Sequence, residues 1–232
     1  MTIAENVAAI RERMTQAALR AGRDPKDVLL CAATKMNGTP AIRKAVAAGV
    51  DCCGENRVQE LLEKQPQGAY EGVPLHFIGR LQTNKVNKLV GRVALIQSVD
   101  RIELLEAIDR AALRLGCVQD ILLEIHLGGE ESKTGFTCAE ARELAAHMRA
   151  YPGVRLQGLM TIPPVSLEKG GNCKYFAEMR NLFVDIGRKT YDNVSMVYLS
   201  MGMTDDFEDA ISEGATMIRI GTAIFGARSV KK

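Results

Sequence analysis

The chain contains no tryptophan, and aromatic residues make up only 5% of its 232 residues. Proteins that bind single-stranded nucleic acid combine a basic groove with aromatic side chains on which the bases stack. Here lysine and arginine are scattered along the chain, and the formal net charge is only +2. The composition therefore argues against nucleic acid as the main partner.

Long uncharged apolar runs are also missing. A membrane-spanning helix needs about 20 consecutive apolar residues, and no run in this sequence approaches that length. Near the N-terminus, charged residues interrupt the apolar ones, so we expect no signal peptide. The sequence therefore predicts no association with a membrane.

Disulfide and metal-binding patterns are absent as well. Cysteines stand at positions 31, 52, 53, 117, 138 and 173, without a CxxC pair and without a ligand-like spacing to the three histidines. Adjacent Cys52 and Cys53 would point to opposite faces of a strand. His76 alternates with apolar neighbours, which predicts a hydrogen-bonded core histidine. Reduced thiols in a cytoplasmic protein without a metal site are the simplest interpretation.

No proline- or serine-rich linker divides the chain, and the one loose stretch covers residues 163–172. An apolar fraction of 47% is ample for one large core. We therefore predict a single domain over residues 1–232, a length typical of α/β barrels. Such a barrel can bury its core as one copy, so we expect a monomer.

What the chain does contain is a regular alternation of apolar strand-like runs with amphipathic helical patterns, several of which end at glycine. Eight strands with seven helices between them predict an α/β fold, a closed (β/α)8 TIM-type barrel. An extra N-terminal helix over 3–22 would cover the gap beside a final helix that is too short. The predicted strands are 27–34, 50–53, 74–79, 93–98, 119–126, 154–160, 194–199 and 216–220, and the helices between them are 39–48, 55–64, 83–90, 101–115, 137–150, 174–190 and 205–213.

Lys35 ends the first predicted strand, after seven residues without a charge. A strand of such apolar character is typical of burial on both faces. Partial burial of an amine lowers its pKa. A neutral amine is the form that condenses with an aldehyde. The alternative is a lysine that extends its amine into solvent where the strand ends.

The loops after the last two strands have the features of an anion site. Barrel active sites lie at the carboxyl ends of the strands, often with a phosphate after strands seven and eight. Ser200 and Gly202 follow the seventh strand, and Gly221 and Thr222 follow the eighth. Glycine permits close approach of the backbone, and outward N–H groups favour an anion. The alternative is that these glycines serve ordinary tight turns.

Barrel closure would place this anion site beside Lys35, with Arg219 reaching into the same mouth. An amine for an aldehyde next to a site for a phosphate describes pyridoxal 5′-phosphate. Asn56, after the second strand, could donate to an oxygen at the aldehyde end of the ring or, alternatively, cap a helix. For Arg219 the alternative is a surface ion pair.

Five blocks of sequence stand in the order of a known family: Gly54–Glu60, His76–Gly79, Gly129–Lys133, Leu199–Met203 and Arg219–Gly226. Together they resemble the pyridoxal phosphate homeostasis proteins, the YggS/PROSC-like family, from the first strand to residue 228. The resemblance implies a barrel similar to the N-terminal domain of alanine racemase, with the cofactor held on Lys35 as an internal aldimine.

The resemblance also implies roles for the other residues of the site. Arg219 takes the position that contacts the pyridine nitrogen of the cofactor. The phosphate positions and the remaining cofactor contacts fall on Ser200, Gly221, Thr222, Met201 and Asn56. Family members affect vitamin B6 and amino-acid balance with no established turnover, and apo enzymes that use the cofactor are candidate partners. Residues 124–129 depart from the asparagine-containing segment expected there, which leaves the substrate side less defined.

A pyridoxal phosphate-dependent racemase or related amino-acid enzyme is the alternative function. Alanine racemases carry a second domain and take a catalytic tyrosine from a partner subunit, whereas here the barrel consumes the chain. Two-base racemisation needs a base on each face of the substrate carbon, and only Lys35 is evident. Arg219 would leave the pyridine nitrogen neutral and the ring a weaker electron sink. We therefore expect a carrier without efficient turnover. A third hypothesis is a barrel enzyme for a phosphorylated metabolite, with Lys35 as its base.

Overall fold

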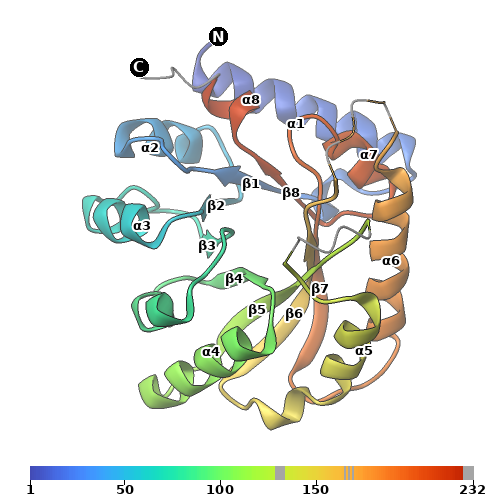
Figure 1. Ribbon diagram of the computed structural model, residues 1–232. Coiled ribbons are helices and arrows are strands. Elements are labelled where there is room, and N and C mark those ends of the chain that lie inside the picture. The colour runs from blue at the N-terminus through green and yellow to red at the C-terminus, as the bar shows by residue number, and fades with distance from the viewer. Residues whose placement is uncertain (129–133, 165, 167, 169, 227–232) are drawn as a thin grey trace.

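Eight parallel strands close into one barrel in the computed structural model (Figure 1), which describes residues 1–128, 134–164, 166, 168 and 170–226. Each strand pairs with its successor in the sequence, and β8 pairs with β1 to complete the ring. The predicted TIM-type barrel is thereby confirmed. The strands are β1 Leu29–Ala33, β2 Cys52–Glu55, β3 Leu75–Phe77, β4 Leu95–Val99, β5 Gln119–Ile125, β6 Val154–Thr161, β7 Val194–Ser200 and β8 Met217–Ile220.

Helices follow the strands and surround the barrel (Figure 1). The α-helices are α1 Ile3–Arg20, α2 Thr39–Ala47, α3 Val58–Lys64, α4 Ile102–Leu115, α5 Cys138–Ala146, α6 Cys173–Gly187, α7 Phe207–Ser212 and α8 Thr222–Phe225. Four short 3-10 helices complete the described elements: η1 Pro25–Asp27, η2 Gln65–Gln67, η3 Thr83–Lys88 and η4 Met148–Ala150.

The predicted extra helix, α1, covers the outside of the barrel where α8 makes only one turn. A capping box between Thr2 and Glu5 starts α1, and the helix packs against α7 and α8 (Figure 1). The Asn6 side chain donates a hydrogen bond of 2.9 Å to the carbonyl of Ile224 in α8. The N-terminal helix therefore completes the helical layer, as expected.

Several elements differ from the sequence prediction: the strand predicted over 74–79 is shorter, and the helix predicted over 137–150 ends at Ala146 and is followed by η4. The second strand extends to Glu55, so the following helix starts only at Val58. The helical pattern predicted over 83–90 forms the 3-10 helix η3. This segment contains threonine and two asparagines, whose side chains compete with the backbone for hydrogen bonds and disfavour a regular α-helix.

Alternate residues of the strands face two different cores. One large apolar core lies between the strands and the surrounding helices and includes Leu30, Cys53 and Ile218. The neighbouring residues face the barrel interior, where Cys31, Cys52 and Met217 form one small cluster and Leu95, Leu122 and Met160 another. The prediction that Cys52 and Cys53 point to opposite faces is confirmed. The interior is thus packed with side chains, which leaves the carboxyl ends of the strands for a site.

Part of the sequence pattern lies outside the described residues, namely Gly129–Lys133 and the residues after Gly226. Among the helices that are described, none combines the length and the apolar character that crossing a membrane would require.

Candidate functional site

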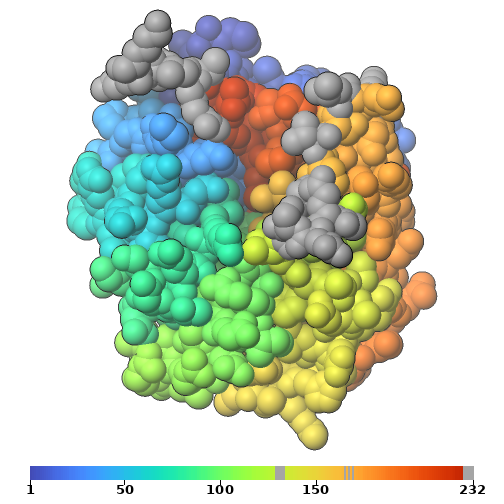
Figure 2. Space-filling view, viewed as in Figure 1, coloured from blue at the N-terminus to red at the C-terminus, as the bar shows by residue number. Residues whose placement is uncertain are grey.

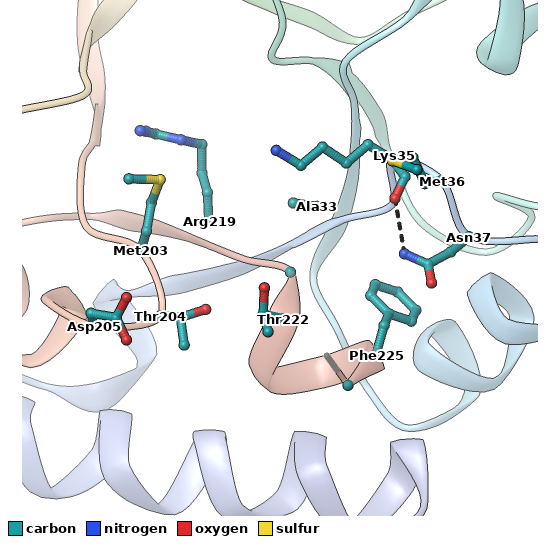
Figure 3. Close-up of a pocket in the computed structure, with 12 residues that line it drawn as sticks. Ala33, Lys35, Met36, Asn37, Met203, Thr204, Asp205, Arg219, Thr222 and Phe225 are labelled. Atoms are coloured by element: carbon teal, nitrogen blue, oxygen red, sulfur yellow. Dashed lines mark hydrogen bonds between the residues drawn. The ribbon is translucent and has the colours of Figure 1, made fainter. Parts of the chain in front are cut away.

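A cavity of about 420 Å3 opens at the carboxyl ends of β1 and β8 (Figure 3). Four of the predicted site residues line it: Lys35, Arg219, Gly221 and Thr222. Lys35 extends its amine toward Arg219, and the hydroxyl of Thr222 faces the space between them (Figure 3). The volume is in the range of small-molecule and cofactor sites, which is about 300–1,000 Å3. Figure 2 shows the molecule in a space-filling view from the same direction as Figure 1.

The lysine sits in a strained turn two residues beyond the end of β1. Met36, the next residue, has φ of +62°, a left-handed conformation that residues other than glycine rarely adopt. The side-chain amide of Asn37 donates a hydrogen bond of 3.1 Å to the carbonyl of Lys35 (Figure 3). Such strain persists only where the surroundings hold it, so the turn fixes the direction of the lysine side chain.

A cluster of charged side chains, buried to different degrees, stabilises that turn from both sides. The hydroxyl of Thr34 donates to Glu55 at 2.8 Å, and the backbone N–H of Met36 donates to Glu60 at 2.8 Å. Lys64 bridges the two carboxylates, with N–O distances of 2.8 and 2.7 Å. Burial alone would raise the pKa of Glu60, but the hydrogen bonds from Lys64 and Met36 outweigh it and lower that pKa. The cluster favours the charged form of Glu60 and keeps the backbone around Lys35 in place.

Asn56 presents an unsatisfied polar atom beside the lysine. Its Oδ1 is buried and has no hydrogen-bond partner among the described residues. Asn56 and Lys35 both line a second cavity of about 330 Å3, to which Gly79 also contributes. A Cβ atom at Gly79 would lie 2.2 Å from the carbonyl oxygen of Asn56, so only glycine fits there. Buried polar atoms are normally paired, and this one is therefore a candidate ligand contact next to Lys35.

Arg219 is anchored inside the barrel mouth. The residue is only 5% exposed, and its guanidinium donates to the carbonyl and hydroxyl of Ser200 at 2.8 and 2.7 Å and to the carbonyl of Thr161 at 2.8 Å. Ser200 in turn donates to Gln97 at 2.7 Å. Desolvation lowers the pKa of Arg219, opposed by the nearby Cys31, yet a guanidinium stays charged at neutral pH. The alternative of a surface ion pair is thus wrong, because the side chain is buried and fixed.

Ser200 and Met201 lie beneath the cavity, and neither is among the residues that line it. Both are fully buried, and Met203 two residues further on reaches the cavity instead. Gly202 has φ of +91°, and a Cβ atom there would lie 2.6 Å from that of Ala210, so this glycine serves packing against α7. Direct contact of Ser200 and Met201 with a ligand stays a prediction.

Glu124 is an ionisable residue of the mouth that sequence reasoning did not assign. It alternates with Leu122 on β5 and so faces the barrel interior. Burial raises its pKa to about 7, with a further rise from Asp100 and an opposing effect from Arg219. The only sequence signal for this role of Glu124 is its position two residues after an inward-facing apolar residue. Besides Lys35, the mouth therefore holds a carboxyl group whose pKa lies near neutral pH.

The prediction that cysteines and histidines form no cluster is wrong. All six cysteines are described and none forms a disulfide, but the barrel brings Cys31, Cys52 and His76 together in its interior. Spacing along the chain could not show this because the three residues lie on three different strands. His76 itself is a buried, hydrogen-bonded histidine, as predicted, with Nδ1 2.9 Å from the amide nitrogen of Gln97.

Comparison with known proteins agrees with this geometry. Residues 3–229 match the family model of the alanine racemase N-terminal domain. A pyridoxal phosphate homeostasis protein from Aquifex aeolicus is 42% identical over 98% of this chain and 99% of its own length. The chain thus belongs to the family of pyridoxal phosphate homeostasis proteins that share this domain.

Solved structures extend the comparison. PipY from Synechococcus elongatus, whose structure has PLP bound, is 34% identical with a TM-score of 0.82, and the match covers 97% of this chain and 100% of PipY. An alanine racemase from Clostridium difficile shares the fold, with a TM-score of 0.69 at 15% identity. That match covers 98% of this chain but only 58% of the racemase.

Proposed function

We propose that this protein binds pyridoxal 5′-phosphate at the cavity between β1 and β8 and acts in vitamin B6 homeostasis as a carrier without efficient turnover. The observation that carries the proposal is one cavity lined by a lysine in a hydrogen-bonded turn, the Thr222 hydroxyl at the start of α8 and an anchored guanidinium. The relatives named for pyridoxal phosphate homeostasis and the PLP-bound PipY support it.

The residues of the cavity fit the chemical groups of this cofactor. When bound, the cofactor supplies an aldehyde that condenses with an amine with loss of water. Lys35 provides that amine, and its strained turn keeps the side chain directed into the cavity. Thr222 and the backbone N–H of Gly221 offer donors for a phosphate, and Arg219, anchored at the same cavity, would be the residue to contact the ring nitrogen. Asn56 lines the adjoining cavity together with Lys35, and its side-chain N–H groups can donate to a ring oxygen.

The phosphate contacts lead to the first prediction. A hydrogen bond to a charged group contributes about 1.5–3 kcal/mol, so Thr222→Val should weaken binding of pyridoxal phosphate about 10- to 100-fold. Binding of pyridoxal, which has no phosphate, should hardly change. Titration of both ligands followed by absorbance measures the two affinities. An equal loss for both ligands would place the phosphate elsewhere.

Gly221→Ala provides a companion test that leaves the fold intact. An added Cβ atom would lie 3.4 Å from the carbonyl oxygen of Ala33 and 3.5 Å from its Cβ, which is ordinary van der Waals contact. The methyl group projects where a bound phosphate would approach the backbone, so affinity should fall while the melting temperature stays unchanged. Unchanged affinity would argue against phosphate binding at this turn.

The carrier function is the second prediction. An open mouth admits water, which weakens electrostatic stabilisation of a carbanion and allows the cofactor to exchange. Loaded protein should therefore transfer pyridoxal phosphate to an apo enzyme in a mixing assay. With common amino acids it should show no turnover near the 1–1000 s⁻¹ typical of enzymes. Turnover in that range, lost in both Lys35→Ala and Glu124→Gln, would instead support an amino-acid enzyme with two acid–base groups.

The remaining features of the proposal concern the state of the protein. We propose that residues 1–232 act as one cofactor-binding domain and that a single copy suffices, because the barrel closes on its own eight strands. Six unpaired cysteines support our prediction of a reducing, cytoplasmic setting. Sedimentation of the loaded protein measures the number of copies directly.

A further inference from the structure

A group of soft metal ligands lies inside the barrel, below the cofactor cavity. Cys31 on β1, Cys52 on β2 and His76 on β3 are at most 5% exposed. The two Sγ atoms and a ring nitrogen of the histidine all lie within 4.8 Å of one another. None of the three residues lines the cofactor cavity. The function proposed above makes no use of this cluster.

The strand register explains why the thiols converge. Cys31 and Cys52 are directly paired residues on neighbouring parallel strands, so their side chains emerge side by side into the interior. Met217 on β8 belongs to the same buried cluster and adds a thioether to it. Two thiols, an imidazole and a thioether in one buried place form a donor set of soft character.

The spacing is compatible with tetrahedral coordination. Zinc–sulfur bonds of about 2.3 Å and zinc–nitrogen bonds of about 2.0–2.1 Å place neighbouring ligand atoms roughly 3.5–3.8 Å apart. Atoms that already lie within 4.8 Å of one another need to close by about 1 Å at most. Side-chain rotation of cysteine and histidine supplies such a shift without movement of the strands.

A second layer of contacts already orients the histidine. Nδ1 of His76 is 2.9 Å from the Gln97 amide, which leaves Nε2 as the nitrogen available to a cation. Metal-bound histidines typically hold their other ring nitrogen in such a contact. Coordination through Nε2 requires the proton on Nδ1, so the Gln97 amide must turn its oxygen toward the ring and give up the hydrogen bond that this oxygen accepts from Ser200. Gln97 also contacts Ser200, so the cluster is linked to the support of Arg219.

We propose that Cys31, Cys52 and His76 form a binding site for one thiophilic d10 cation, Zn²⁺ or Cu⁺, inside the barrel. Binding converts both thiols to thiolates and releases their protons to solvent, so a Zn²⁺ site carries no net charge and a Cu⁺ site carries one negative charge beside Arg219. The thioether of Met217 is placed to complete the coordination of Cu⁺, the softer ion. This site is separate from the cofactor cavity and does not depend on the proposed function.

The test uses the full-length protein after removal of metals with a chelator under reducing, anaerobic conditions. Separate titrations with Zn²⁺ and Cu⁺, each against a competing chromophoric chelator, give stoichiometry and affinity. We expect one tightly bound ion per chain, and the tighter of the two identifies the ion. The variant carrying both Cys31→Ser and Cys52→Ser should bind at least about 100-fold more weakly. Retention of one tight ion by this variant, or none in the wild type, would overturn the proposal.

Cys53→Ala is the matched control, because Cys53 lies on the same strand as Cys52, is equally buried and faces the helices instead. It should keep the full stoichiometry, and loss of the ion in this variant would mean that the cluster is not the site. Loading the metal-free wild-type protein with Co²⁺ gives a readout that does not depend on folding of the variants. Where Zn²⁺ is the tighter ion, thiolate-to-cobalt charge-transfer absorption with tetrahedral bands is expected, and the absence of these bands would equally overturn the site.

Discussion

Replacing Lys35 with alanine should abolish the covalent adduct that borohydride traps when the purified protein is incubated with pyridoxal phosphate. The amine of Lys35 is directed into the cavity by a turn that the ionic cluster of Glu55, Glu60 and Lys64 holds in place. Without this amine, no other lysine among the described residues lines the cavity. Mass spectrometry of peptides after reduction should therefore find the adduct on residue 35 in the wild type and no adduct there in the variant.

Two controls make this result specific. Lys85→Ala removes a lysine of η3 outside the cavity and should leave the adduct at Lys35 unchanged. The melting temperature of Lys35→Ala should match that of the wild type, because the hydrogen bonds of the turn involve its backbone and its neighbours rather than its amine. An adduct of full yield on a different lysine in the wild type would contradict the assignment.

The sequence was sufficient to predict the barrel and the residues at its mouth, because both follow from local patterns. Alternating apolar runs and helical stretches predict the order of elements, and the closure rule then brings Lys35 next to Gly221 and Thr222. The extent of β2 was harder to predict. Glu55 is a charged residue that continues the strand because Thr34 and Lys64 satisfy its carboxylate, and neither partner is visible from the strand itself.

Interior contacts between distant strands could not be predicted from one sequence. In the sequence, Ser200 suggests an exposed hydroxyl near a glycine. In the structure it is buried and hydrogen-bonded to Gln97, a residue 103 positions earlier. The same holds for Cys31, Cys52 and His76, whose convergence depends on the register of three strands. A shift of one residue in any strand would turn its side chains to the opposite face, and sequence periodicity does not fix the register between strands.

Arg219→Met should reduce both stability and cofactor binding, and it is the interior substitution with the largest expected effect on folding. The guanidinium satisfies the carbonyls of Ser200 and Thr161 and the hydroxyl of Ser200. Methionine fills similar space but leaves these buried acceptors without a donor, at about 1–3 kcal/mol each. Since some will find other partners, we expect a loss of about 3 kcal/mol in the free energy of unfolding, or roughly 6–12 °C in melting temperature. Denaturant unfolding of the cofactor-free protein measures this directly.

Two further variants, Arg155→Met and Arg219→Lys, separate the contribution of the hydrogen bonds to stability from that of the charge. Arg155 forms a surface ion pair with Asp120 and is 52% exposed, so its loss should cost less than about 1 kcal/mol. Lysine at position 219 keeps the positive charge, but one ammonium group cannot match the planar fork that contacts Ser200 and Thr161 together. Arg219→Lys should therefore be intermediate in stability. Equal stability of Arg219→Met and Arg155→Met would show that water replaces the guanidinium, and that the anchored geometry of Arg219 does not hold the barrel mouth together.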